Sequence, residues 1–219
     1  MRFLRCVHAE WLLVPPRLTR TRLGVSLVAL AAVLVWLNGR GLDPLTVAMQ
    51  AGALSSIVGA ASAAGSDAER AAFSVALTHP TTGLAIATGR WLMVVVPAAV
   101  ITSACVIVVG WHAPAAIAGL AAAAAVGSCA LALVLVGGKG AALMLFLFMA
   151  VAGAIAPERL VDLAHPGLVR LAAASALELG PALWHYRDIA AGDRGAILHA
   201  IAWTVLGILL SGGLVARRR

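Results

Sequence analysis

Long apolar runs alternate with short polar interruptions along almost the whole chain. A helix needs roughly 20 apolar residues, with a range near 17–25, to cross a bilayer core of about 30 Å. Six stretches meet or approach this length, at residues 23–37, 44–65, 91–111, 114–136, 138–156 and 196–215. The pattern therefore predicts an all-α membrane protein with six transmembrane helices, built as a single domain over residues 1–219.

Composition agrees with the hydrophobic pattern. The 219 residues are 62% hydrophobic and 11% charged, with a mean hydropathy of +1.00, whereas a soluble domain is roughly 45–50% apolar and about 25% charged. A water-soluble protein of this size could not remove so much apolar surface from water. The soluble classes are therefore excluded. The net charge of +7 indicates basic flanks facing anionic lipid, and we expect no nucleic-acid partner.

Tryptophans and basic residues predict how the helices lie in the bilayer. Trp36, Trp91, Trp111 and Trp203 fall at or near the ends of predicted helices, as in an aromatic belt. Six helices put both termini on one side. If that side is cytoplasmic, the inner basic residues are Arg2, Arg5, Arg17, Arg20, Arg22, Arg70, Arg90, Lys139, Arg217, Arg218 and Arg219. The outer ones are Arg40, Arg159, Arg170, Arg187 and Arg194. The excess of positive charge inside favours cytoplasmic termini.

Two segments outside the six runs have their own patterns. Residues 1–22 carry apolar side chains at helical spacing and end at Pro15 and Pro16, which predicts an interfacial amphipathic helix. Residues 157–195 are mostly apolar but too broken for a seventh span, which predicts re-entrant helices shielded by protein. Within them Arg170 and Glu178 share a helix face and are candidates for the substrate path. Alternatively, both side chains are simply solvated at the outer membrane interface.

Small residues recur at helical spacing in two of the predicted spans. They are Gly52, Gly59 and Ala63 in one, and Gly119, Ala123 and Gly127 in the other. Such stripes let helix backbones approach closely. The sequence leaves open whether they pack the bundle or form a dimer face.

The interruption between the second and third runs is longer than a simple hairpin needs. Ser66 and Glu69 form a capping box, and His79 and Pro80 end the helix that they begin. Thr81 or Thr82 can then cap the helix that leads into the third span. We therefore predict a cytoplasmic loop over 66–90 with a short, exposed helix over 66–80.

This loop resembles a known family. The stretch "ERAAFSVALTHPTTGLAIATGRWL", residues 69–92, resembles the first cytoplasmic loop of ABC-type-2 permeases, the membrane subunits of bacterial ABC exporters. Its matching positions are Glu69, Arg70, Leu77, Pro80, Gly89 and Arg90. The closing segment resembles that of copper-processing and gliding-type permeases, with matches at His185, Tyr186, Ile189 and Gly192.

The resemblance implies a transporter subunit in the bacterial inner membrane. The 66–80 helix would be a coupling helix that contacts a separate ATP-binding cassette ATPase through Asp67, Glu69, Arg70, Phe73, Leu77, His79 and Pro80. The working unit would hold two permease chains, as a homodimer or a related pair, and two ATPase chains. ATP and magnesium would sit on the partner, because "GGKGAAL" at 137–143 lacks the spacing and final Ser/Thr of a Walker loop.

Other functions remain as alternatives. They are a haem-exporter-like permease of cytochrome maturation, and a structural subunit of a membrane complex without transport activity. We expect no catalytic residues, no cofactor and no metal site in this chain, because the six histidines show no metal-binding spacing. The cargo stays open among drug, lipid, peptide and cofactor.

Overall fold

The computed structural model describes residues 4–5, 7–8, 12, 23–65, 82–151, 167, 175 and 180–217. Every continuous regular element within these residues is helical. The α-helices are α3 (Leu23–Asn38), α4 (Pro44–Ala60), α7 (Gly83–Val109), α8 (Ala113–Val151), α11 (Leu183–Arg187) and α12 (Arg194–Ala216). A π-helical turn, η1 (Ala61–Gly65), extends α4, and a 3₁₀ turn, η3 (Asp188–Ala191), follows α11.

Four of the described helices are long and apolar enough to cross a membrane. They are α4 with its η1 extension, α7, α8 and α12. The helix α3 is equally apolar, but it has only 16 residues. The chain is thus an all-helical, membrane-embedded protein.

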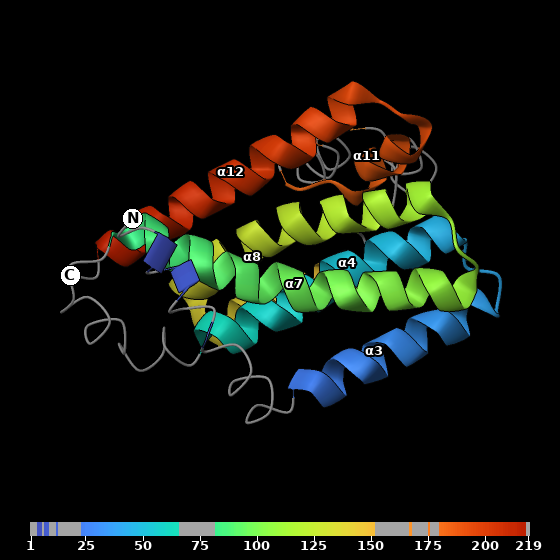
Figure 1. The fold of residues 1–219 in the computed structure, drawn as a ribbon, viewed down its shortest axis with the longest axis horizontal. Coiled ribbons are helices and arrows are strands. Elements are labelled where there is room, and N and C mark those ends of the chain that lie inside the picture. The colour runs from blue at the N-terminus through green and yellow to red at the C-terminus, as the bar shows by residue number, and fades with distance from the viewer. Residues whose placement is uncertain are drawn as a thin grey trace.

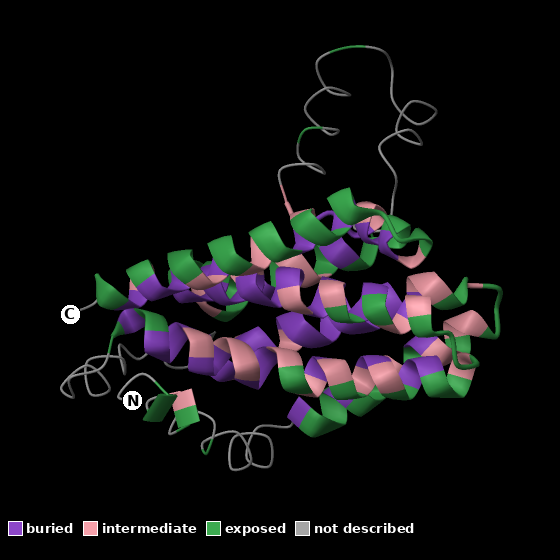
Figure 2. Cartoon of the chain, turned by 45° about the horizontal axis from the view of Figure 1, so that its top comes forward, coloured by how far each residue is buried: buried purple, intermediate pink, exposed green. Residues whose placement is uncertain are grey.

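The bundle is built around α4. Figure 1 shows α3 and α12 at opposite edges, with α4, α7 and α8 between them. In its most apolar window, 83% of the α4 residues are buried, against 22% for α12, and Figure 2 shows the exposed residues along the outward faces. The mean hydropathy of that α4 window is only 1.4, against 2.7 for α7. Because protein surrounds α4, the helix accommodates polar residues such as Gln50 and Ser56.

The helix α8 consists of two arms, residues 113–137 and 139–151, that meet at Gly138. The first arm runs alongside α4 in the same direction, since Gly119 packs on Gly52 and Gly127 packs on Ser56. The second arm returns in the opposite direction. Lys139 lines a cavity with Ser62, and Gln50 Nε2 donates to the carbonyl oxygen of Met149 at 3.2 Å. The chain therefore reverses at Gly138, whose φ of 63° and ψ of −154° are open essentially to glycine alone.

These arms agree with the separate runs predicted at 114–136 and 138–156, as far as residue 151. The ends of α3, α4 and α12 also lie close to the predicted ends. The helix α7 begins at Gly83, ahead of the apolar run at 91–111, in agreement with the helix cap predicted at Thr81 or Thr82. Thr82 caps it, with Oγ1 accepting a hydrogen bond from the Ala85 amide at 3.2 Å.

Two of the four tryptophans in the predicted aromatic belt lie inside described helices. Trp91 lies about two turns inside α7, and its Nε1 donates to the carbonyl oxygen of Ala124 at 3.2 Å. Trp203 also lies inside its helix and packs against the core. The prediction that Trp203 marks a span end is therefore wrong, whereas the position of Trp91 at the start of the membrane span stays a prediction, because the 27 residues of α7 exceed the roughly 20 that a bilayer needs. Trp36 and Trp111 do lie near helix ends, and both are exposed.

The small-residue stripes pack the bundle from within. A Cβ atom on Gly52 would overlap the carbonyl oxygen of Gly119, and one on Gly119 would lie 2.6 Å from that of Ala48. A Cβ on Gly127 would lie 3.0 Å from the Cβ of Ser56. Of the two roles left open by the sequence, packing inside one chain is thus the observed one: Gly52, Gly119 and Gly127 serve the contact between α4 and α8, and Gly59 meets Val94 of α7.

Candidate functional site

The predicted site residues all lie outside the described part of the chain. This holds for the coupling-helix residues Asp67, Glu69, Arg70, Phe73, Leu77, His79 and Pro80, and for the substrate-path candidates Arg170 and Glu178. The re-entrant segment is described only from residue 180, apart from the single positions 167 and 175. Of the N-terminal segment, Leu4, Arg5, Val7, His8 and Leu12 are helical. What the structure describes fully is the two helix ends between which the 66–81 segment runs.

The first of these ends is held by a buried arginine. Arg90, in α7, is 4% exposed, and its Nη1 donates to the carbonyl oxygen of Ala63 at 2.6 Å. Ala63 belongs to η1, the π-helical turn that finishes α4. A hydrogen bond from a charged guanidinium is roughly twice as strong as a neutral one. The last turn of α4 is thus tied to α7 directly before the 66–81 segment begins.

The second end is packed against the last helix. A Cβ on Gly83, the first residue of α7, would overlap the carbonyl oxygen of Gly212. Conversely, a Cβ on Gly212 would lie 3.1 Å from the Cα of Leu84. The backbones of α7 and α12 therefore meet directly after the 66–81 segment ends.

The two ends form one anchored base, defined here by Ala63, Gly83, Arg90 and Gly212. Three long helices meet at it: α4 through Ala63, α7 through Gly83 and Arg90, and α12 through Gly212. From the sequence, Arg90 was expected only as an inner basic residue and as one of the positions that carry the family resemblance. Its position as a lone cation within an apolar run was the available signal for a buried role.

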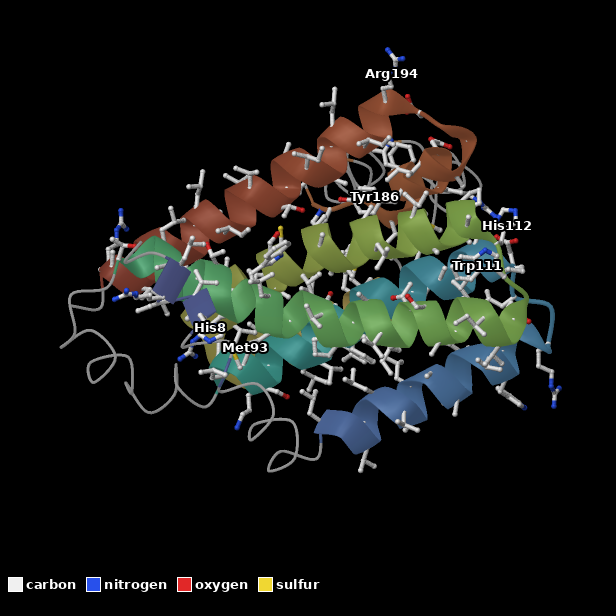
Figure 3. The ribbon with its side chains drawn as sticks, in the orientation of Figure 1. His8, Met93, Trp111, His112, Tyr186 and Arg194 are labelled. Carbon is white, nitrogen blue, oxygen red and sulfur yellow. The ribbon has the colours of Figure 1, made fainter. Side chains whose placement is uncertain are left out.

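A second cluster lies at the opposite end of the bundle. It consists of Trp184, His185 and Tyr186 from α11 with His199 and Trp203 from α12, and we call it the aromatic–histidine cluster. The rings of Trp184 and His185 stack with centroids 3.8 Å apart, and His185 lies 5.1 Å from His199. Figure 3 shows Tyr186 beside α12 and Arg194 at the tip of that helix, pointing away from the bundle.

Hydrogen-bond donors dominate this cluster. Trp203 Nε1 donates to His199 Nε2 at 3.0 Å. The neutral His199 ring therefore carries its proton on Nδ1. That atom, Trp184 Nε1 and the Tyr186 hydroxyl are buried and have no hydrogen-bond partner within the described residues. Burial raises the pKa of the fully buried Tyr186 well above its ordinary value, so the phenol stays protonated.

Only part of the aromatic–histidine cluster was predicted from the sequence. The family resemblance singled out His185, Tyr186, Ile189 and Gly192, all of which lie in α11, in η3 or directly after them. It missed the contribution of α12. The signal was present as His199 and Trp203, four residues apart and therefore on one helix face.

Neither region has the composition of a metal centre. No group of three His, Cys, Asp or Glu side chains within the described ranges is placed to hold a metal ion. Comparisons with models of protein families, with curated proteins and with solved structures found no match to this chain. A functional proposal therefore rests on the anchored base and on the resemblance of residues 69–92.

Proposed function

We propose that this chain is the membrane permease subunit of an ABC exporter, driven by a separate ATPase that contacts the 66–80 helix. The working unit is a pair of permease chains with a pair of ATPase chains in the bacterial inner membrane. The partner supplies the ATP and magnesium site, and this chain supplies the path for the cargo. The low polarity of its helices favours an amphipathic or hydrophobic cargo.

The anchored base is the observation that carries the proposal. A partner that pushes on a segment can move a helix only if the segment is coupled to it mechanically. Ala63 and Arg90 connect α4 to α7, and Gly83 and Gly212 connect α7 to α12. Movement of the 66–81 segment would therefore reach three membrane helices at once. A simple hairpin between two spans has no need of such bracing.

The cycle follows from this coupling. ATP binding draws the two ATPase chains together, and each ATPase chain moves the 66–80 helix of the permease seated on it. The bundle switches between states as rigid helices rather than by continuous deformation, because close-packed helix interfaces resist partial displacement. Hydrolysis and release of the partner's nucleotide return the helices to the first state.

Six spans with cytoplasmic termini complete the proposal. Its support is the direction of the described helices: α3 begins and α12 ends toward the end of the bundle where α4 and η1 finish (Figure 1). His8 lies toward that end, while Trp111 and His112 lie at the other (Figure 3). The proposed six comprise α3, α4, α7, the two arms of α8 and α12.

The test is the coupling between ATP hydrolysis and transport. The double variant Phe73→Asp with Leu77→Asp puts two charges on the apolar face of the predicted helix. We expect ATPase activity in reconstituted vesicles to lose its dependence on the permease, while the melting temperature of the permease stays unchanged. The matched control is Ala71→Asp with Val75→Asp, which adds the same charges to the opposite helix face.

If the Phe73 and Leu77 variant retained coupling and only the control lost it, the contact with the ATPase would lie on the other face of the helix. Equal loss of coupling in both variants would mean that added charge, and not a specific contact, is responsible. A chain that never stimulates or associates with an ATPase would favour the structural-subunit alternative instead.

A further inference from the structure

A groove opens between the end of α4 and the second arm of α8. Its volume is about 330 Å³, within the range of small-molecule sites in proteins. We call it the inner groove, and its lining residues are Ile57, Val58, Ala61, Ser62, Lys139, Ala142, Leu143 and Phe146. It lies beside the anchored base but shares no residue with it.

The inner groove has a polar end and an apolar end. Because α4 and the second arm of α8 are antiparallel, Ser62 lies opposite Lys139, and Ile57 lies toward Phe146. Phe146 is seven residues beyond Lys139, which is about 10 Å along a helix. Lys139 and Ser62 thus line the groove at the end of the bundle where α4 finishes, and the described lining residues toward the middle of the membrane are apolar.

The wall of the groove at its polar end is irregular. Ala61 and Ser62 belong to η1, where the chain takes a π-helical turn instead of continuing α4. Such turns are rare and are found frequently at functional sites. Here the turn places Ser62 in the wall that faces Lys139.

We propose that the inner groove binds an anionic phospholipid from the cytoplasmic leaflet. The Lys139 ammonium and the Ser62 hydroxyl would hold the phosphate. One acyl chain would lie along Ile57, Leu143 and Phe146. The site goes beyond the proposed function, since it requires no ATPase, but it does rest on the proposed orientation of this end toward the cytoplasm.

Charge complementarity selects this occupant over others. Among the described residues that line the groove, Lys139 is the charged one. Basic pockets between membrane helices on the cytoplasmic side are typical binding sites for anionic headgroups. The separation of charge and apolar surface also matches a lipid with its phosphate at the interface and its chain directed inward. A second protein chain would need an apolar or acidic partner surface along the full length.

The experiment uses the purified full chain and native mass spectrometry. Dioleoyl phosphatidylglycerol or dioleoyl phosphatidylcholine is added in detergent, and retained lipid is counted. We expect the wild type to prefer the glycerol lipid. Lys139→Gln should reduce that preference about fivefold, the effect of one cation near an anionic lipid, and Lys139→Arg should retain it. Ala61→Phe, which fills the groove, should reduce retention of both lipids.

Met144→Phe is the matched control for the filled groove. Met144 lies on the same arm of α8, is 71% exposed and is not among the lining residues, so its replacement should leave lipid retention unchanged. A photoreactive residue at Leu143 should give a lipid adduct in membranes. Unchanged glycerol-lipid preference in Lys139→Gln, or unchanged lipid retention in Ala61→Phe, would overturn the proposal. So would a Leu143 adduct to a second copy of the chain.

Discussion

Glycine sets the distance between helices at the centre of this molecule. Where Gly52 meets Gly119, the α4 backbone approaches that of α8 too closely for any side chain. Other glycines have no such role, since Cβ atoms on Gly24, Gly140 and Gly213 would meet nothing within 4 Å. Glycine count alone therefore does not identify the contacts that hold the bundle.

Gly52→Ala tests this contact. Overpacking a close interface typically costs about 1–3 kcal/mol, so we expect a clear drop in the melting temperature measured in detergent. Gly213→Ala is the control in α12. It should hold or slightly raise the melting temperature, because alanine is the better helix former by roughly 1 kcal/mol. An equal change in melting temperature in the two variants would contradict the packing described for α4 and α8.

At the scale of single residues, the sequence shows its limits most clearly with tryptophan. Trp36 and Trp111 are exposed near helix ends, as an aromatic belt predicts. Trp91 follows the same local pattern, yet it lies inside α7 and donates to Ala124. The difference arises because the helix capped at Thr82 begins ahead of the hydrophobic run. The cap was predicted from the sequence, but the contact of Trp91 with α8 depends on tertiary packing that a hydrophobic run does not reveal.

At the scale of elements, hydrophobic runs predicted the positions of the helices well. Run length and polar breaks are local properties, and α3, α4 and α12 accordingly begin and end close to their predicted bounds. The π-helical turn η1 and the pairing of α11 with α12 were not predicted. Both depend on contacts between distant segments, such as Arg90 with Ala63 and His185 with His199.

Gly138 offers a test at this scale. Its backbone conformation excludes side chains, so Gly138→Ala should strain the reversal between the two arms of α8 and lower the melting temperature. Gly140→Ala, two residues away and with open space around its Cα, should be neutral or stabilising. A tolerated alanine at 138 would mean that the arms do not reverse there as described.

At the scale of the whole molecule, the ends of the bundle have different characters. One end holds the anchored base, the inner groove and Arg217, the residue that follows α12. The other carries the aromatic–histidine cluster and an ion pair between Arg187 and Asp43, with Nη2 and Oδ2 3.0 Å apart. Both partners of that pair are about half exposed, so we expect it to contribute little to stability.

The orientation of these ends can be measured by cysteine labelling. In a variant whose native cysteines are replaced, Ser66→Cys should react with a membrane-impermeant reagent only from the cytoplasmic side. Arg194→Cys, at the exposed tip of α12, should react only from outside. Reaction of both from the same side would contradict the proposed path of the chain.

The central claim is that a separate ATPase works on the 66–80 helix. It is tested most directly by purifying the tagged chain from its native host in a mild detergent and identifying by mass spectrometry what remains bound. The account predicts an ATP-binding cassette subunit in roughly equal amount, lost in the Phe73→Asp with Leu77→Asp variant and retained in the Ala71→Asp with Val75→Asp control. A chain that purifies alone, or only with other membrane proteins, would contradict it.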